Sequence, residues 1–557
     1  MISRIFLATF VALGFSAGAA NAQEAAAELL QRVPDNFGFC LVINDLAGQS
    51  ERWTKAPWFA KLRENPLVRG VLDGKEVGDL LRLEQEVKKR VDLDFAFLFE
   101  EVLGHAVVLA YQPPAKGQPS SEKGLLLIKT RKAETIADFV EKVNQLQSNL
   151  GELTSLEDRK YKNQAYYRRV HQNATHFYFV KDATLAISNH EDVIQNLLDR
   201  DTKAASARRD QWLSARLTKS VATLWINPRT FDAEFVHQAK NKTGPEGAAL
   251  QSIVAFWQGL DGLFVSVQGD DAPELRLTLL ARPGTPAAKA WNTPPAPSAE
   301  LWRRFPENAL LSGAFTVDFA KALKKLKDSL SEKDAGIELL VQKNLAAATG
   351  LDVYREMLPN LGPDIGFALT LPEGASLPRG LVALAVQSAP KEAPVDQTLL
   401  KAANLFLGLA IFDYNRKNTD PIRVRTLQQD GVEVKFLDQD KIFPSSVQPA
   451  LALKEGYLLV GSSPDAIADF RADRSPAAAS AETPLLKMAP REWSRLMKAQ
   501  RQAMIDHLVK KHRDTPDAAA NVVDGIAAGL ELFQSLNLTQ RAAAGQSAWT
   551  LRLTPAK

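Results

Sequence analysis

The apolar residues of this chain fall into short runs that predict strands, separated by segments with helical spacing. Continuous apolar runs at residues 39–43 and 310–317 each predict a buried strand. Two further runs, at 176–180 and 184–187, flank a polar turn and predict a hairpin. Apolar residues recur at helical spacing within 133–146, which predicts an amphipathic helix. Hairpins mixed with helices indicate an α+β fold with a largely antiparallel sheet.

Two further helices are predicted from apolar stripes, one in each half of the chain. The stripes consist of Leu80, Leu83, Val87 and Val91 in the first half, and of Phe319, Leu323, Leu326 and Leu330 in the second. Short helices are also expected to begin near Glu191 and at Pro464.

One order of motifs occurs twice, at an offset that stays between 256 and 276 residues. The matching motifs are Pro34-Asp35-Asn36 with Pro306-Glu307-Asn308, Leu93-Asp94 with Leu351-Asp352, Leu103-Gly104 with Leu361-Gly362, Gly124-Leu125 with Gly380-Leu381, Lys181-Asp182 with Lys454-Glu455, and Leu275-Arg276-Leu277-Thr278 with Leu551-Arg552-Leu553-Thr554. We therefore expect two homologous tandem domains, 33–285 and 305–557, each a largely antiparallel sheet with packed helices. The prolines of residues 286–304 predict a stiff linker between them.

The N-terminal residues predict export. Arg4, an apolar stretch over 5–17 and the small residues of Ala20-Asn21-Ala22 follow the order of a signal peptide, which we place at 1–22. The apolar stretch is shorter than the roughly 20 residues that a membrane-spanning helix needs. Cys40 is the sole cysteine, so no disulfide can form within the chain, and its apolar neighbours predict a buried thiol. We expect a disulfide-free protein in the periplasm or outside the cell.

The charge balance is nearly even, with a formal net charge of +3 and 24% charged residues of both signs, so no nucleic-acid partner is expected. Residues 491–513 depart from this balance, because seven basic residues stand there against two acidic ones. The corresponding first-half segment, 229–242, is far less basic. The candidate contact residues are Arg491, Arg495, Lys498, Arg501, Lys510 and Lys511.

A basic helix with Trp493 and Leu496 on an apolar side can lie on an anionic surface or receive an acidic partner. Peripheral contact with an anionic surface is therefore one hypothesis for this segment. The alternative is a solvated helix that packs on its own sheet.

No motif for catalysis or cofactor binding stands out. Ser120 with Lys123, and Ser388 with Lys391, have a serine–lysine spacing but lie in proline-rich loops. His171 and His176 are the best metal candidates and are expected to form a cross-strand pair in a hairpin. A structural zinc needs three or four ligands and no further ligand is in view, so we predict no metal site, no cofactor and no catalytic residue.

The proline-led opening strand, the Leu-Asp to Leu-Gly segment, the glycine-led strand and the Lys-acidic-small turn together resemble a family of exported bacterial proteins that carry a domain of unknown function, here in two tandem copies. The resemblance implies export and an α+β fold. It implies no activity, ligand or catalytic residue.

We expect a non-catalytic binding or structural protein of the bacterial envelope, whose partner is an unidentified envelope protein or ligand. Two alternatives stay open. One is a carrier of a hydrophobic ligand, held between a curved sheet and its helices. The other is an enzyme whose site is not visible as a motif.

Overall fold

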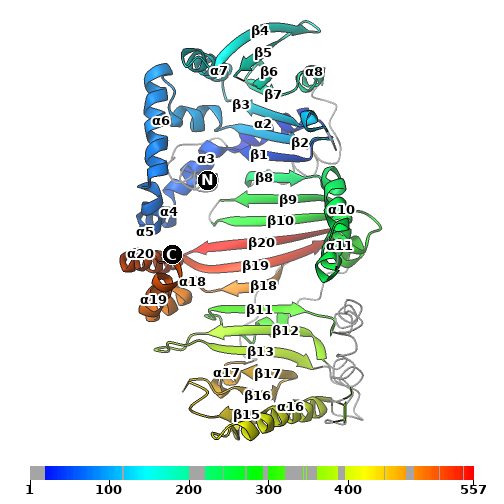
Figure 1. The fold of residues 1–557 in the computed structure, drawn as a ribbon, viewed down its shortest axis with the longest axis vertical. Helices are drawn as coiled ribbons and strands as arrows, with labels where there is room; N and C mark the ends of the chain where they lie inside the picture. The colour runs from blue at the N-terminus through cyan, green and yellow to red at the C-terminus, as the bar shows by residue number, and fades with distance from the viewer. Residues whose placement is uncertain are drawn as a thin grey trace. The chain divides into compact units, whose positions relative to one another are not determined.

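The chain divides into two compact units. Both consist of antiparallel strands with helices (Figure 1), which confirms the predicted α+β class. The first unit comprises residues 1–293, 524–533 and 542–557, and the second comprises 294–523 and 534–541. The computed structural model describes residues 19–115, 118–172, 174–199, 220–242, 244–269, 272–292, 299–319, 343, 346–347, 361–386, 395–444, 446–471, 482–513, 515–543 and 545–556.

The sheet of the first unit has antiparallel strands in the order β4-β5-β6-β7-β3-β2-β1-β8-β9-β10-β20. These strands are β1 (Phe39–Asn44), β2 (Ala106–Gln112), β3 (Lys123–Lys129), β4 (Leu153–Tyr161), β5 (Gln164–His171), β6 (Ala174–Lys181), β7 (Thr184–Ser188), β8 (Ser220–Ile226), β9 (Leu260–Gln268), β10 (Glu274–Ala281) and β20 (Gln546–Pro555).

The first unit also contains helices, several of which pack on its strands. They are α2 (Ala19–Arg32), α3 (Leu46–Lys55), α4 (Pro57–Glu64), α5 (Pro66–Leu72), α6 (Lys75–Val91), α7 (Ala133–Asn149), α8 (Glu191–Asp199), α10 (Asp232–Lys240), α11 (Gly244–Gln258) and α12 (Pro286–Asn292). In α2, Leu29 and Leu30 are buried in one core cluster with Val108. In α7, Ile136 is buried in a second cluster, with Tyr178.

The sheet of the second unit has the order β14-β15-β16-β17-β13-β12-β11-β18-β19. Its strands are β11 (Leu311–Thr316), β12 (Leu361–Thr370), β13 (Arg379–Val386), β14 (Arg423–Gln429), β15 (Val432–Asp438), β16 (Ala450–Lys454), β17 (Tyr457–Gly461), β18 (Thr483–Met488) and β19 (Phe533–Ala543). Its helices are α13 (Ala299–Trp302), α16 (Val395–Lys417), α17 (Pro464–Ala468), α18 (Pro490–Ala499), α19 (Arg501–His512) and the first part of α20 (Pro516–Glu531). The main core of this unit includes Leu301, Phe305 and Phe470.

Nine strands of the first unit, β4-β5-β6-β7-β3-β2-β1-β8-β9, match the nine strands of the second unit one for one. Each of these strands in the first unit has a counterpart at the same position in the strand order of the second unit. The described strands of the two units therefore share one topology.

Most predicted elements are confirmed, among them β1, β11, the hairpin β6–β7, and the helices α6, α7, α8 and α17. Helices α3 to α5 and the hairpin β4–β5 were not predicted. The residues expected to form a helix from Leu323 to Leu330, and the motif Leu351-Asp352, lie outside the described residues, as do residues 1–18 of the expected signal peptide. The expected linker 286–304 contains α12 and α13 in its described parts.

Cys40 is buried in β1, as predicted. In the described part of the chain, no helix is both long enough and apolar enough to cross a membrane.

Candidate functional site

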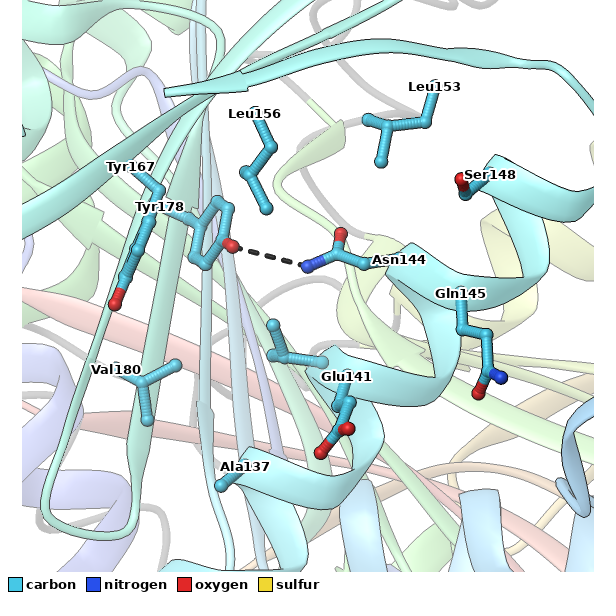
Figure 2. A pocket seen from close by; sticks show the side chains of 11 residues that line it. Ala137, Glu141, Asn144, Gln145, Ser148, Leu153, Leu156, Tyr167, Tyr178 and Val180 are labelled. Atoms are coloured by element: carbon cyan, nitrogen blue, oxygen red, sulfur yellow. Dashed lines mark hydrogen bonds between the residues drawn. The ribbon is translucent and has the colours of Figure 1, made fainter. Parts of the chain in front are cut away.

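An open cleft of about 640 Å³ lies between α7 and the strands β4, β5 and β6. Figure 2 shows the helix along one side of it and the strands along the other. Leu153 and Leu156 of β4 and Val180 of β6 supply apolar wall, and Val140 of α7 contributes from the helix. Leu156 is 44% exposed, so part of this wall is in contact with solvent.

The floor of the cleft is a pair of tyrosines. Tyr167 of β5 and Tyr178 of β6 are directly opposite in register, and their rings stack with centroids 4.9 Å apart. Asn144 Nδ2 of α7 donates a hydrogen bond to Tyr178 Oη over 3.3 Å (Figure 2). Burial, the largest cause, raises the pKa of the Tyr178 hydroxyl, so this group stays protonated at neutral pH.

Three nitrogen-rich side chains, Arg169, His171 and His176, continue the same face of the sheet beyond the tyrosines. Alternation along a strand puts Arg169 and His171 on the face of Tyr167, and His176 on the face of Tyr178. Arg169 is directly opposite both Leu156 on β4 and His176 on β6. The two imidazole rings stack with centroids 5.4 Å apart and an interplanar angle of 11°. We call these three residues the Arg169 cluster.

The Arg169 cluster has buried polar atoms without partners. Nε and Nη2 of Arg169, Nδ1 of His171 and Nδ1 of His176 are buried and have no hydrogen-bond partner among the described residues. Burial is the largest cause and lowers the pKa of the Arg169 guanidinium, while electrostatic interactions with Tyr178 and Glu152 act in the opposite direction. Burial first, and then the charges of His171 and Arg169, lower the pKa of His176. A guanidinium without acceptors is costly to bury, so the cluster favours an anionic acceptor.

The two histidines stack across the β5–β6 hairpin, as predicted, but they are not directly opposite in register. His171 is opposite Ala174, and His176 is opposite Arg169, so the imidazoles meet diagonally. The positive guanidinium beside His176 opposes a bound cation. Within the described residues, no group of three or more His, Cys, Asp or Glu side chains is placed to hold a metal ion. The absence of a structural metal stays a prediction.

The basic segment forms two helices, α18 and α19, which meet at Gln500. Arg491, Arg495, Lys498, Arg501, Lys510 and Lys511 are all exposed. Arg495 also pairs with Glu492 over 2.7 Å and donates to the carbonyl oxygen of Leu371.

The apolar side of this segment packs within the second unit. Leu496 is buried in a cluster with Leu310 and Leu371, and Trp493 Nε1 donates to the carbonyl oxygen of Leu310 over 2.8 Å. Ile505 of α19 is buried in another cluster, with Val523. Other residues of the second unit therefore cover these apolar side chains. This agrees with the alternative stated above, a solvated helix that packs on its own sheet. Contact of the basic residues with a partner stays a prediction.

The serine–lysine spacing finds no support in the first loop, where Lys123 Nζ is ion-paired with Asp192. Ser388 and Lys391 lie outside the described residues.

Four residues of the candidate site were not predicted from the sequence, namely Tyr167, Tyr178, Asn144 and Arg169. The available signal was the alternation within residues 164–171, which places an aromatic residue and a basic residue on each face of one strand.

A family model described as "Protein of unknown function (DUF3352)" matches residues 77–405, more than half of the chain. The matched region includes every residue of the cleft and of the Arg169 cluster. No curated protein matches the chain.

Proposed function

Because the chain belongs to the family described as "Protein of unknown function (DUF3352)", a description that assigns no activity, we propose a function from the structure of the chain itself. The protein is an exported, non-catalytic binding protein of the bacterial envelope. Its cleft between α7 and β4–β6 takes up the apolar part of a small amphipathic molecule.

The cleft is the observation that carries this proposal. Its volume of about 640 Å³ falls inside the range of about 300–1,000 Å³ that is usual for small-molecule sites. Such sites combine apolar walls with a few polar groups that fix the orientation of the ligand. Here Leu153, Leu156 and Val180 supply the wall, and Asn144 and Tyr178 supply the polar groups.

A neutral fluorescent probe such as N-phenyl-1-naphthylamine tests the cleft directly. We expect saturable binding by the parent protein and a several-fold weaker affinity in the Leu156→Asn variant, because a polar amide then replaces accessible apolar wall. Leu275→Asn is the matched control, since Leu275 is also 44% exposed on a strand but lies outside the cleft. A parent that binds no probe, or equal losses in both variants, would contradict the proposal.

We also infer that the chain contains an internal duplication, in which the described strands of one copy repeat those of the other. The shared order of nine strands supports this inference. The turn between β6 and β7 and the turn between β16 and β17 both hold an acidic residue in the left-handed region, Asp182 with φ 53° and Glu455 with φ 52°.

The last strands of the two proposed copies add further support. The repeated Leu-Arg-Leu-Thr motif falls on β10 and on β20, which pair with each other, and Leu275 is directly opposite its counterpart Leu551. Pairing between equivalent residues is the pattern of a two-fold symmetric contact. An experimental structure in which the two copies differ in strand order would refute the duplication.

A further inference from the structure

We propose that the ligand of this cleft is a single-chain amphiphile with a carboxylate head group, which binds with its head at the Arg169 cluster and its chain along the apolar wall. This inference rests on the proposed function of the cleft and names the chemical class of its ligand.

The Arg169 cluster adjoins residues that line the cleft. Arg169 is directly opposite Leu156, and His171 is directly opposite Leu153, and both leucines line the cleft. One step along the same face lie Tyr167 and Tyr178, which form its floor. An elongated ligand can therefore touch apolar wall with one end and the guanidinium with the other.

The unpartnered atoms of Arg169 match a carboxylate. Nε–H and Nη2–H share one edge of the planar guanidinium, and both nitrogens are buried without an acceptor among the described residues. A carboxylate can accept two parallel hydrogen bonds along such an edge. The carboxylate of Glu152 acts on Arg169 only through its charge, since neither a hydrogen bond nor an ion pair joins these two described residues.

The histidines complete a polar end for the ligand. Each has a buried Nδ1 without a partner in the described part of the chain, and the rings stack beside the guanidinium. An imidazole can present an N–H to an acceptor. The head group would thus replace hydrogen bonds that the folded chain does not supply.

The neighbouring arginine shows the contrast. Arg168 lies on the opposite face of β5, and its Nη1 is 2.5 Å from Glu157 Oε1. This arginine has an internal acceptor, whereas two buried nitrogens of Arg169 have none. Arg168→Gln therefore removes the same charge from the same strand without touching the proposed site, which makes it the matched control.

The test compares three probes with the same twelve-carbon chain, dodecanoate, dodecanol and dodecyltrimethylammonium, by titration calorimetry with the full-length exported protein. We expect the parent protein to bind dodecanoate at least tenfold more tightly than dodecanol, and the cationic probe most weakly. Arg169→Gln should reduce dodecanoate affinity to that of dodecanol and leave dodecanol affinity unchanged. Arg168→Gln should keep the preference.

Arg169→Lys is a second variant, which keeps the charge but loses the two-donor edge, and its preference should be intermediate. Equal affinities of the parent for dodecanoate and dodecanol, or an unchanged preference in both Arg169 variants, would overturn the head-group assignment while leaving the cleft. Failure of all three probes to bind would refute the proposed function itself.

Discussion

The Glu274→Ala substitution tests the pairing of β10 with the C-terminal strand β20. Glu274 is only 8% exposed, and its Oε2 accepts hydrogen bonds from Arg552 Nε at 3.0 Å and Nη2 at 2.8 Å. Its Oε1 lies 3.7 Å from Arg276 Nη2. Arg276 Nε in turn donates to Thr550 Oγ1 over 3.1 Å, so four side chains form one network across the two strands.

The magnitude follows from burial on the two sides of the pair. Breaking a fully buried ion pair costs about 3–5 kcal/mol. The Arg552 side chain is 48% exposed, so water can solvate it once the carboxylate is gone, and we expect a loss of about 2 kcal/mol. The first unit has about 300 residues, and at an unfolding entropy of about 2.1 cal/mol/K per residue this loss corresponds to a drop in Tm of about 3 °C.

Unfolding is followed by heat and by urea, with tryptophan fluorescence as the signal, because Trp549 lies on β20 opposite Leu277. Asp413→Ala is the control: it removes an exposed carboxylate that pairs with Arg416 and Lys417, and we expect no resolvable change. A double-mutant cycle with Arg552→Ala should show a loss smaller than the sum of the single losses. A Glu274→Ala variant as stable as the control, or an additive cycle, would refute the reasoning.

Three further predictions concern stability and processing. Burial is the main cause that lowers the pKa of His105 below its ordinary value of 6.5, so near that pH the unfolded chain binds more protons than the folded chain. The free energy of unfolding, measured with urea, should therefore fall as the pH drops through 6.5. In His105→Gln it should depend less on pH. Gly366→Ala would place a Cβ 2.7 Å from Leu301 Cδ2 and should lower the free energy of unfolding by about 1–3 kcal/mol. Gly408→Ala, on the open surface of α16, is the control and should leave that free energy unchanged or slightly higher in the same assay. If residues 1–22 are a signal peptide, as we propose, N-terminal sequencing of the mature protein should begin at Gln23. A mature chain that keeps residues 5–17 would contradict this proposal.

The apolar centre of each sheet could be predicted from the sequence, but the elements around the cleft could not. Strands such as β1 are continuous apolar runs, with one face buried and the other partly buried, and such a run can be recognised from the sequence alone. In β4, partly buried and exposed residues alternate along the whole strand. Because it also contains many charged residues, its sequence lacks the apolar run that would predict a strand. Helices α4 and α5 begin with Pro57 and Pro66. Proline is favoured at the first position of a helix, but it is also common in loops, so these prolines alone did not indicate helices.

The site depends on what the fold places around a residue. Arg168 and Arg169 are adjacent and identical in the sequence, yet one has Glu157 as a partner and the other has two buried nitrogens without one. Alternation along β5 puts the two arginines on opposite faces, but the residues opposite them, Glu157 and Leu156, belong to β4 and cannot be found from the local sequence of β5. For the same reason the sequence shows the charges of the basic segment but not the packing of its apolar side.

The pairing of β10 with β20 sets an order of events during synthesis. β10 ends at Ala281, but the strand that covers its edge begins at Gln546, so more than 260 residues must be made before that edge is closed. Until then the nascent chain exposes an unpaired strand edge, which is a template for aggregation. The first unit therefore cannot complete its sheet until β20 has been made. A chain that stops before β20 would keep this edge open, and a chaperone that holds the chain until its end has emerged would protect it.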